Sequence, residues 1–148
     1  MDLKEKLAEL NEKGCSLTIQ RHAILEYLYE NRTHPTVEKI YYSLKEKFST
    51  ISRATVYNTL ELLKNYGLIQ EITIEKGKSR FDYEVKTHHH FLCHRCNRVY
   101  DVNVEGCPLA GKKMINGHKI EELRPYIIGI CSKCLQKKKS NDNFVMMN

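Results

Sequence analysis

Apolar side chains recur every three to four residues through the first half of the chain, a spacing that predicts amphipathic helices. Thr18, Thr36 and Ser52 each precede such a stretch, and we expect them to cap the helices that follow. A helix is not expected to run through His34-Pro35, because the residue before a proline is disfavoured in the α conformation. The core positions expected for four successive helices are Leu3, Leu7 and Leu10; Ile24, Leu25 and Leu28; Ile40, Leu44 and Phe48; and Val56, Leu60 and Leu63.

After Gly67 the period of the pattern changes to two, which is typical of half-buried strands. One strand is expected over residues 69–74 and a second over 80–85, joined by a turn at 75–78. Helices followed by a two-stranded hairpin predict a winged helix-turn-helix, an architecture that binds DNA.

The second half of the chain predicts a separate, small α/β domain that begins near residues 85–87. Its expected elements are strands at residues 88–92, 98–102 and 126–130 and a weak helix between Pro108 and Ile115. The predicted fold class is therefore α+β. The expected organisation is a winged-helix domain at residues 1–85, the small α/β domain at 86–136 and a disordered tail at 137–148.

Composition narrows the class of protein. The chain has 148 residues, of which 41% are hydrophobic, and this balance excludes a disordered protein, a collagen and a membrane protein. No apolar run approaches the length of a membrane-spanning helix, and residues 1–20 are charged and amphipathic, unlike a signal peptide. We therefore expect a cytoplasmic protein with no membrane partner.

The net charge of +6 invites a nucleic-acid interpretation, but its location weakens that argument. Residues 1–84, which include the predicted DNA-binding domain, carry 13 basic and 13 acidic side chains. The whole excess lies in residues 85–148, where a terminal lysine run supplies half of it. Bulk charge is thus a poor predictor of DNA binding here.

The helix expected after Ser52 has the properties of a recognition helix. When its apolar positions face the core, the opposite face presents side chains that can contact bases and phosphates in a major groove. The candidate DNA-binding residues are Ser52, Arg53, Thr55, Tyr57 and Asn58. An ordinary solvated helix face would show the same periodicity. Lys76, Lys78 and Arg80 are candidates for backbone contacts from the wing.

Two Cys-x-x-Cys pairs, Cys93/Cys96 and Cys131/Cys134, are separated by 34 residues. Each pair places two sulfurs on one tight turn, and two such turns facing each other complete a tetrahedral thiolate site for structural Zn²⁺. The alternatives are two disulfides, a rubredoxin-like iron site or a thiol-redox pair. Cys15 and Cys107 are left over as ordinary thiols.

His88-His89-His90 is an internal histidine run, so it is not a terminal tag. On a strand, His88 and His90 share one face while His89 points away. Two imidazoles on one face can begin a metal site, although many such pairs bind nothing. Asp82 and Asp101 on flanking strands, together with His34 at the interhelical turn, favour a second metal site.

The order of these motifs resembles that of the ferric uptake regulator superfamily, from about residue 3 to residue 136. The motifs are Thr18-Ile19-Gln20-Arg21, His34-Pro35-Thr36, Ser52-Arg53-Ala54-Thr55-Val56-Tyr57, Ser79-Arg80-Phe81-Asp82, His88-x-His90 and the two Cys-x-x-Cys pairs. The resemblance implies a homodimeric, metal-responsive transcriptional repressor of operator DNA. It also implies that the second domain dimerises, and that the chain is not an enzyme.

Within that superfamily the chain is most similar to the peroxide-sensing branch. The resemblance implies a regulatory Fe²⁺ or Mn²⁺ site formed by His34, Asp82, His88, His90 and Asp101, in which His34 and His88 match the ligands that peroxide oxidises. Aspartate at 82 and 101 favours this branch, because iron-uptake members usually carry glutamate there. The alternatives are an iron or manganese uptake regulator without histidine oxidation, a zinc-ribbon interaction module and, more remotely, a thiol-redox enzyme.

Overall fold

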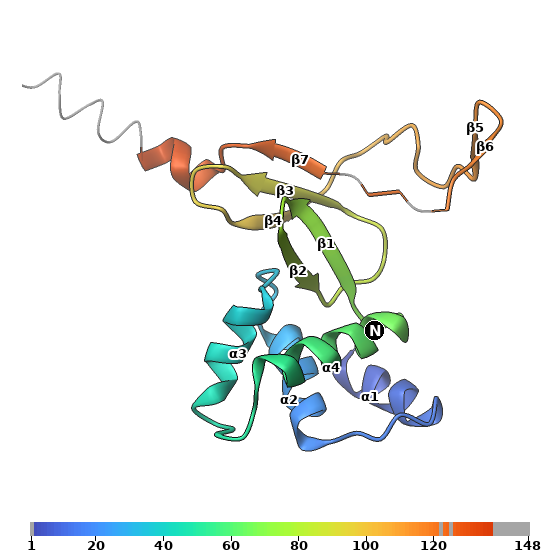
Figure 1. The fold of residues 1–148 in the computed structure, drawn as a ribbon. Coiled ribbons are helices and arrows are strands. Elements are labelled where there is room, and N and C mark those ends of the chain that lie inside the picture. The colour runs from blue at the N-terminus through green and yellow to red at the C-terminus, as the bar shows by residue number, and fades with distance from the viewer. Residues whose placement is uncertain (1, 122, 125, 138–148) are drawn as a thin grey trace, which may run out of the picture. The chain divides into compact units, whose positions relative to one another are not determined.

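A computed structural model describes residues 2–121, 123–124 and 126–137. The chain divides into two compact units, one up to Val85 and the other from Lys86 onward (Figure 1). The elements of the first unit are α1 (Leu3–Glu12), α2 (Ile19–Glu30), α3 (Val37–Lys45), α4 (Arg53–Asn65), β1 (Gln70–Glu75) and β2 (Lys78–Asp82). This is the order of a winged helix-turn-helix, in which β1 and β2 form the antiparallel wing.

Capping residues set the starts of the four helices. Thr18, Thr36 and Ser52 occupy the N-cap positions of α2, α3 and α4, and each side chain accepts a hydrogen bond from the backbone N–H three residues on. In α1, Asp2 and Glu5 form a reciprocal capping box that the apolar spacing did not reveal. The three predicted caps are therefore confirmed.

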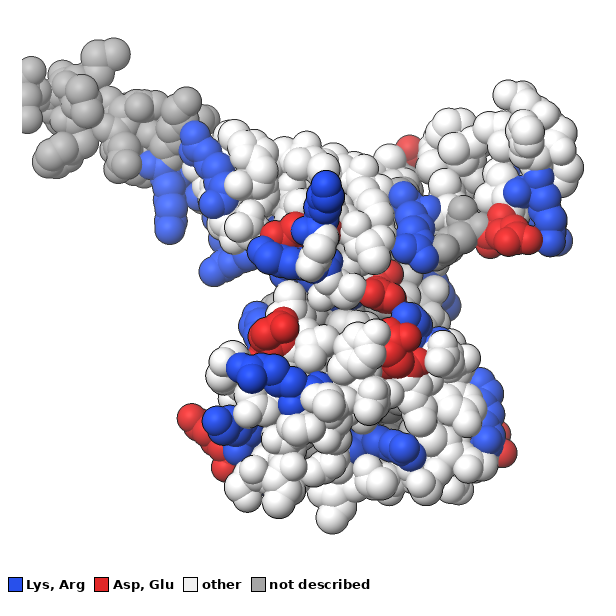
Figure 2. Space-filling view, viewed as in Figure 1, with Lys and Arg blue, Asp and Glu red and all other residues white. Residues whose placement is uncertain are grey.

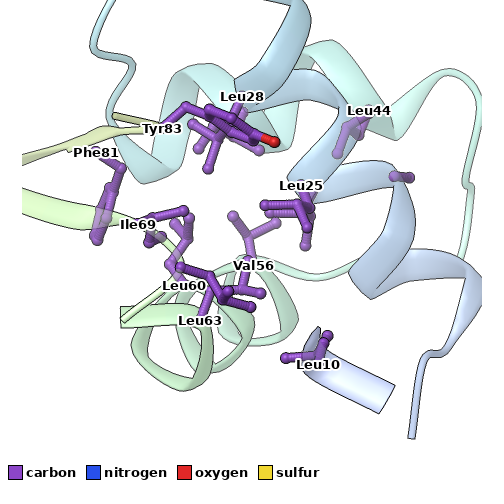
Figure 3. Close-up of a cluster of buried hydrophobic side chains, with 14 of the residues drawn as sticks. Leu10, Leu25, Leu28, Leu44, Val56, Leu60, Leu63, Ile69, Phe81 and Tyr83 are labelled. Atoms are coloured by element: carbon purple, nitrogen blue, oxygen red, sulfur yellow. The ribbon is translucent and has the colours of Figure 1, made fainter. Parts of the chain in front are cut away.

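One core cluster joins the four helices to the wing (Figure 3). The positions predicted to face inward are buried, except Leu3, Leu7 and Phe48, which are partly buried against the cluster. Phe48 lies beyond the end of α3 at Lys45, so that helix is shorter than predicted. Fully burying one such aliphatic side chain contributes about 1.5–3 kcal/mol to folding. The same periodicity that places these residues inside leaves the opposite face of α4 exposed.

The charged side chain of Lys6 is buried in α1, with 2% of its surface exposed. Its Nζ donates hydrogen bonds to the backbone carbonyls of Leu68, just before β1, and Tyr83, just after β2. The ammonium also lies 3.5 Å from the centre of the Tyr83 ring. Lys6 therefore ties α1 to the base of the wing, where β1 begins and β2 ends, a contact that no local sequence pattern predicts.

Lys6 should make the stability of the first unit depend on pH. Burial lowers the pKa of Lys6 from its ordinary 10.5 to about 8, although the carboxylate of Glu84 opposes the shift. Between these two values the unfolded chain binds more protons than the folded chain, so stability rises with pH across this window. We expect the urea midpoint of the wild type to rise relative to that of Lys6→Met when the pH is raised from about 7.5 to 9.5. A constant difference between the two proteins would contradict this expectation.

The second unit has a three-stranded sheet in the order β4-β3-β7. Its strands are β3 (His89–Cys93), β4 (Val99–Val102) and β7 (Tyr126–Gly129), with β4 antiparallel and β7 parallel to β3. Gly129 permits the close approach of β7, because a Cβ atom there would lie 3.0 Å from the Phe91 ring. The predicted α+β architecture of a winged helix followed by a small sheet domain is confirmed.

Two other details of the prediction are wrong. The weak helix expected between Pro108 and Ile115 is a series of turns leading into a hairpin of β5 (Met114–Ile115) and β6 (His118–Lys119). Asn116 and Gly117 in its turn have φ values of 47° and 82°, the left-handed conformation that an Asn-Gly hairpin turn requires. The second strand of the wing also ends early, at Asp82, because its partner strand β1 begins opposite it, at Gln70.

The described helices include none that is long and apolar enough to cross a membrane. Of the predicted disordered tail at residues 137–148, only Lys137 lies within the described residues.

Candidate metal centres and nucleic-acid interface

The four paired cysteines meet at one end of the β3–β7 pair. Cys93 is the last residue of β3 and lies opposite Gly129 at the end of the parallel strand β7, so the two Cys-x-x-Cys turns begin side by side. The four sulfurs lie within 4.8 Å of one another. Cys96 Sγ and Cys131 Sγ are 3.8 Å apart, close to the edge of about 3.8 Å of a tetrahedron with Zn–S bonds of 2.3 Å. The donor set and spacing fit a structural zinc ion.

Hydrogen bonds prepare two of these sulfurs to bind a cation as thiolates. Burial raises the pKa of Cys93, but backbone N–H groups, including that of Cys131 at 3.3 Å, outweigh it and bring the pKa to about 6. The Tyr100 hydroxyl donates to Cys131 Sγ at 3.5 Å and lowers the pKa of that thiol. The pKa of Cys134 rises to about 12, chiefly through its hydrogen bond with Cys131. Like charges oppose ionisation of all four sulfurs unless a cation balances them.

All six cysteines are free thiols. A disulfide needs its sulfurs about 2.05 Å apart, much closer than the 3.8 Å between Cys96 and Cys131. Cys15 is buried in the first unit and Cys107 is half-buried in the second, and neither belongs to the four-sulfur cluster.

The first unit brings His34 and Asp82 together in a buried position. His34 Nε2 lies 3.8 Å from Asp82 Oδ2, and both side chains are almost fully buried. The carboxylate accepts hydrogen bonds from the Gln70 amide at 3.1 Å and from the backbone N–H of Glu84 at 2.9 Å. These two donors orient the Asp82 oxygens, as the hydrogen-bond partners of metal ligands commonly do.

Contacts from β2 hold the turn that carries His34. The Phe81 N–H donates to the Pro35 carbonyl at 3.0 Å, and the Arg80 guanidinium donates to the His34 carbonyl at 3.4 Å. His34 has a φ of 51°, a left-handed conformation that is unusual for a residue other than glycine. Such backbone strain persists where the surroundings enforce it and is concentrated at functional sites. The wing therefore fixes the position of His34 as well as that of Asp82.

The second unit gathers His88, His90 and Asp101. His90 and Asp101 lie directly opposite each other on β3 and β4, and His88 immediately precedes β3. Asp101 Oδ1 lies 3.0 Å from His88 Nε2 and 3.6 Å from His90 Nε2. The ring centres of the two histidines are 4.3 Å apart, as the strand alternation predicts.

Both ring nitrogens of His88 have partners. Nδ1 lies 2.7 Å from the carbonyl oxygen of Lys86, and Nε2 faces Asp101. When Nδ1–H donates to that carbonyl, the neutral ring has its lone pair on Nε2, where a metal could bind. Both groups thus consist of imidazole nitrogens and carboxylate oxygens, which suit Fe²⁺ or Mn²⁺ better than thiophilic ions.

The predicted recognition face of α4 is exposed in most of its length. Ser52, Arg53, Tyr57 and Asn58 are exposed, whereas Thr55 is half-buried. The hydroxyls of Ser52 and Thr55 lie 2.8 Å apart and cap the helix, so these two side chains have a structural role in addition to any contact with DNA. Figure 2 shows acidic side chains interspersed among the basic ones, which agrees with the equal numbers of basic and acidic side chains in residues 1–84.

A groove of about 700 Å³ runs between α4, the start of α3 and the tip of the wing, and it is lined by Arg53, Tyr57 and Asn58. The Arg53 guanidinium is held in place by α3, where the Tyr42 hydroxyl accepts its hydrogen bond at 2.6 Å. An arginine fixed in this way loses less side-chain freedom when it binds a phosphate.

Lys76 and Lys78 are exposed on the wing, but two of the three wing cations form ion pairs within it. Arg80 pairs with Glu75 at 3.0 Å and is only 13% exposed, and Lys78 pairs with the same carboxylate at 2.8 Å. These pairs fix the wing more than they extend it. Sequence reasoning also missed Gln70, Tyr42 and Tyr100, because their partners lie on other elements and leave no local pattern.

Residues 12–125 match the model of the ferric uptake regulator family. The chain belongs to this family. Its membership accounts for the order of the motifs along both units, and it confirms the resemblance drawn from them.

Relatives within the family align over nearly the whole chain. The peroxide operon regulator of Bacillus subtilis (strain 168) is 39% identical over 139 residues, covering 93% of this chain and 96% of the relative. The peroxide-responsive repressor PerR of Staphylococcus aureus (strain USA300) is 34% identical over 138 residues, covering 92% and 93%. The matched lengths include both units.

Solved structures agree with the fold. PerR from Streptococcus pyogenes, described as sensing peroxide and regulating genes, matches with a TM-score of 0.55 at 30% identity, covering 90% of this chain and 94% of that one. The ferric uptake regulator Fur of Helicobacter pylori matches with a TM-score of 0.75 over 91% and 95% of the two chains. At 20% identity the second match supports the fold alone.

Proposed function

We propose that this family member is a metal-dependent, peroxide-responsive transcriptional repressor that binds operator DNA as a homodimer. The observation that carries the proposal is the pair of nitrogen and oxygen donor groups, His34 with Asp82 and His88 with His90 and Asp101. The relatives named as peroxide regulators, at 33–39% identity, support the peroxide signal over metal uptake. A repressor of chromosomal genes acts in the bacterial cytoplasm.

We assign the two kinds of donor set different tasks. Cys93, Cys96, Cys131 and Cys134 hold Zn²⁺ as a structural ion, because four protein ligands leave no open position for chemistry. The five His and Asp residues together hold the regulatory Fe²⁺ or Mn²⁺, with ligands from both units. A metal shared in this way stabilises one relative orientation of the two units, so its binding selects the DNA-binding state.

Peroxide sensing follows from the ligand chemistry. Bound Fe²⁺ would supply the electrons that break the O–O bond of peroxide. One peroxide oxygen would be added to the imidazole of His34 or His88, which is thereby oxidised by two electrons, and the other oxygen would leave as water. The oxidised ring would be a poorer ligand, so fewer donors would hold the metal. The units lose their fixed orientation, and the affinity for DNA falls. With Mn²⁺ the same residues would hold the DNA-binding state without this oxidation.

Oxidation of the purified, Fe²⁺-loaded protein tests this function. We expect one equivalent of peroxide to add 16 Da to peptides that contain His34 or His88 and to release operator DNA in a gel shift. The Mn²⁺-loaded protein is the matched control, and it should keep its mass and its DNA. No added mass on either peptide would overturn the peroxide-sensing role, and DNA that stays bound would then favour an iron-uptake regulator.

DNA recognition is assigned to α4, with Asn58 and Tyr57 reading bases while Arg53 contacts a phosphate. We expect Asn58→Ala to weaken binding to the preferred operator by about 1–3 kcal/mol at fixed salt, because it removes a bidentate base contact. Lys64→Ala, at the far end of the same helix, is a control that should bind nearly as well as the wild type. Equal affinity of Asn58→Ala and wild type would contradict the recognition role of this face.

A further inference from the structure

Tyr100 contacts the four-sulfur cluster from outside its two Cys-x-x-Cys turns. It lies on β4 opposite Phe91 of β3, half-buried, and its hydroxyl donates to Cys131 Sγ at 3.5 Å. Cys131 Sγ is in turn 3.8 Å from the Sγ atom of Cys96, which is an exposed residue. The phenol therefore contacts one sulfur of a pair that is 3.8 Å apart.

We propose that Tyr100 protects the zinc-binding thiolates from peroxide, so that oxidation is directed to the histidine and aspartate centre. The proposal rests on the peroxide-sensing function. A peroxide sensor with a thiolate cluster in the same chain contains two oxidisable centres. Only one of them should respond, because loss of zinc would remove the structural support of the second unit.

The reaction that Tyr100 would slow consists of two displacements. A sulfur lone pair of Cys131 attacks one oxygen of hydrogen peroxide, the O–O bond breaks, and the products are a sulfenic acid and hydroxide. The neighbouring Cys96 thiolate then attacks this oxidised sulfur, so that a disulfide forms and a second hydroxide leaves. Two thiolates together lose two electrons, peroxide gains them, and both hydroxides take up protons to become water. Two zinc ligands are lost.

A hydrogen bond to sulfur slows the first displacement. The O–H of Tyr100 stabilises the same lone pair that attacks peroxide, and this stabilisation is lost as the pair becomes a bond. When a thiolate is stabilised, about 0.4–0.5 of that stabilisation free energy is added to the activation free energy of its attack. For a hydrogen bond to a charged acceptor, this fraction corresponds to a rate about 3- to 10-fold lower.

The test compares the wild type with Tyr100→Phe, which keeps the ring and removes the hydroxyl. Zinc-loaded proteins with Mn²⁺ at the regulatory site are treated with hydrogen peroxide, and zinc release is followed with a chromogenic chelator. We expect release from Tyr100→Phe to be about 3- to 10-fold faster. Tyr29→Phe, which alters an exposed tyrosine of the other unit, is the control and should match the wild type.

Three further measurements keep the result interpretable. Without peroxide, zinc release into the chelator should be equally fast from the wild type and Tyr100→Phe. If Tyr100→Phe releases zinc faster by the same factor with and without peroxide, Tyr100 has only a packing role. If Tyr100→Phe does not retain zinc, Tyr100→Leu supplies a second variant without a donor. Equal peroxide-driven release from wild type and variant overturns the proposal. Added mass on His34 or His88 peptides of the Fe²⁺ form is measured separately, so failure of the sensing function remains distinguishable.

Discussion

Replacement of Cys93 by serine, or removal of zinc with a strong chelator, is expected to unfold the second unit and leave the first unit folded. Within the described residues, the core cluster consists of side chains from the first unit. The buried apolar side chains described in the second unit are Leu92 and Val99, together with the cysteines 93 and 131 themselves. So small a core does not stabilise a sheet without help, whereas structural zinc contributes about 10–16 kcal/mol at neutral pH.

Hydrogen exchange resolved along the chain measures this effect. Amides of β3, β4 and β7 should lose protection in Cys93→Ser, while those of α2 and α4 keep it. Cys107→Ser is the matched control, because that thiol lies in the same unit but outside the cluster. A folded Cys93→Ser protein that had lost a thiol-dependent turnover would instead favour the redox-enzyme alternative.

The local parts of the fold could be predicted from the sequence. Helix caps such as Thr36 and Ser52 act within one turn, and apolar periodicity follows directly from helix geometry, so both are visible in a linear pattern. The cysteine spacing is equally local, because each pair defines one turn. The Asn116-Gly117 turn carries an equally local signal, and the weak-helix interpretation of that segment overlooked it.

Contacts between distant elements could not be predicted in this way. Burial of a lysine at position 6 depends on two carbonyls more than sixty residues away, at Leu68 and Tyr83. The support that Arg80 gives to the His34 turn likewise joins the wing to an interhelical loop. The resemblance supplied the ligand residues of the regulatory site, but only the structure shows the donors that orient them, such as Gln70.

These orienting contacts explain how one DNA-binding unit can offer a well-defined half of a metal site. Asp82 ends β2, so its position follows from the wing, and the Gln70 amide reaches it from the paired strand. The wing is in turn anchored to α1 through Lys6. The proposed metal therefore binds ligands that are already positioned, which reduces the loss of side-chain freedom on binding.

Asp82→Asn and Asp101→Asn are each expected to lower the affinity for Mn²⁺ by about 100-fold or more, although the two residues belong to different units. Loss of an outer contact to a metal site typically costs 10- to 100-fold, and loss of a charged ligand should cost at least as much. Titration of the zinc-loaded chain with Mn²⁺, followed by electron paramagnetic resonance or calorimetry, measures the affinity. Glu105→Gln, an exposed carboxylate of the second unit, is the control and should bind like the wild type.

Comparison of the two single variants makes this test specific for a shared metal. If all five ligands bind one ion, each chain binds one Mn²⁺, and Asp82→Asn and Asp101→Asn both lower the affinity for that same ion. Both variants then lose metal-dependent DNA binding. If His88, His90 and Asp101 bind the ion alone, Asp82→Asn leaves the Mn²⁺ affinity unchanged. That outcome would remove the physical link between metal binding and the orientation of the recognition helix, because a metal held within one unit does not constrain the other.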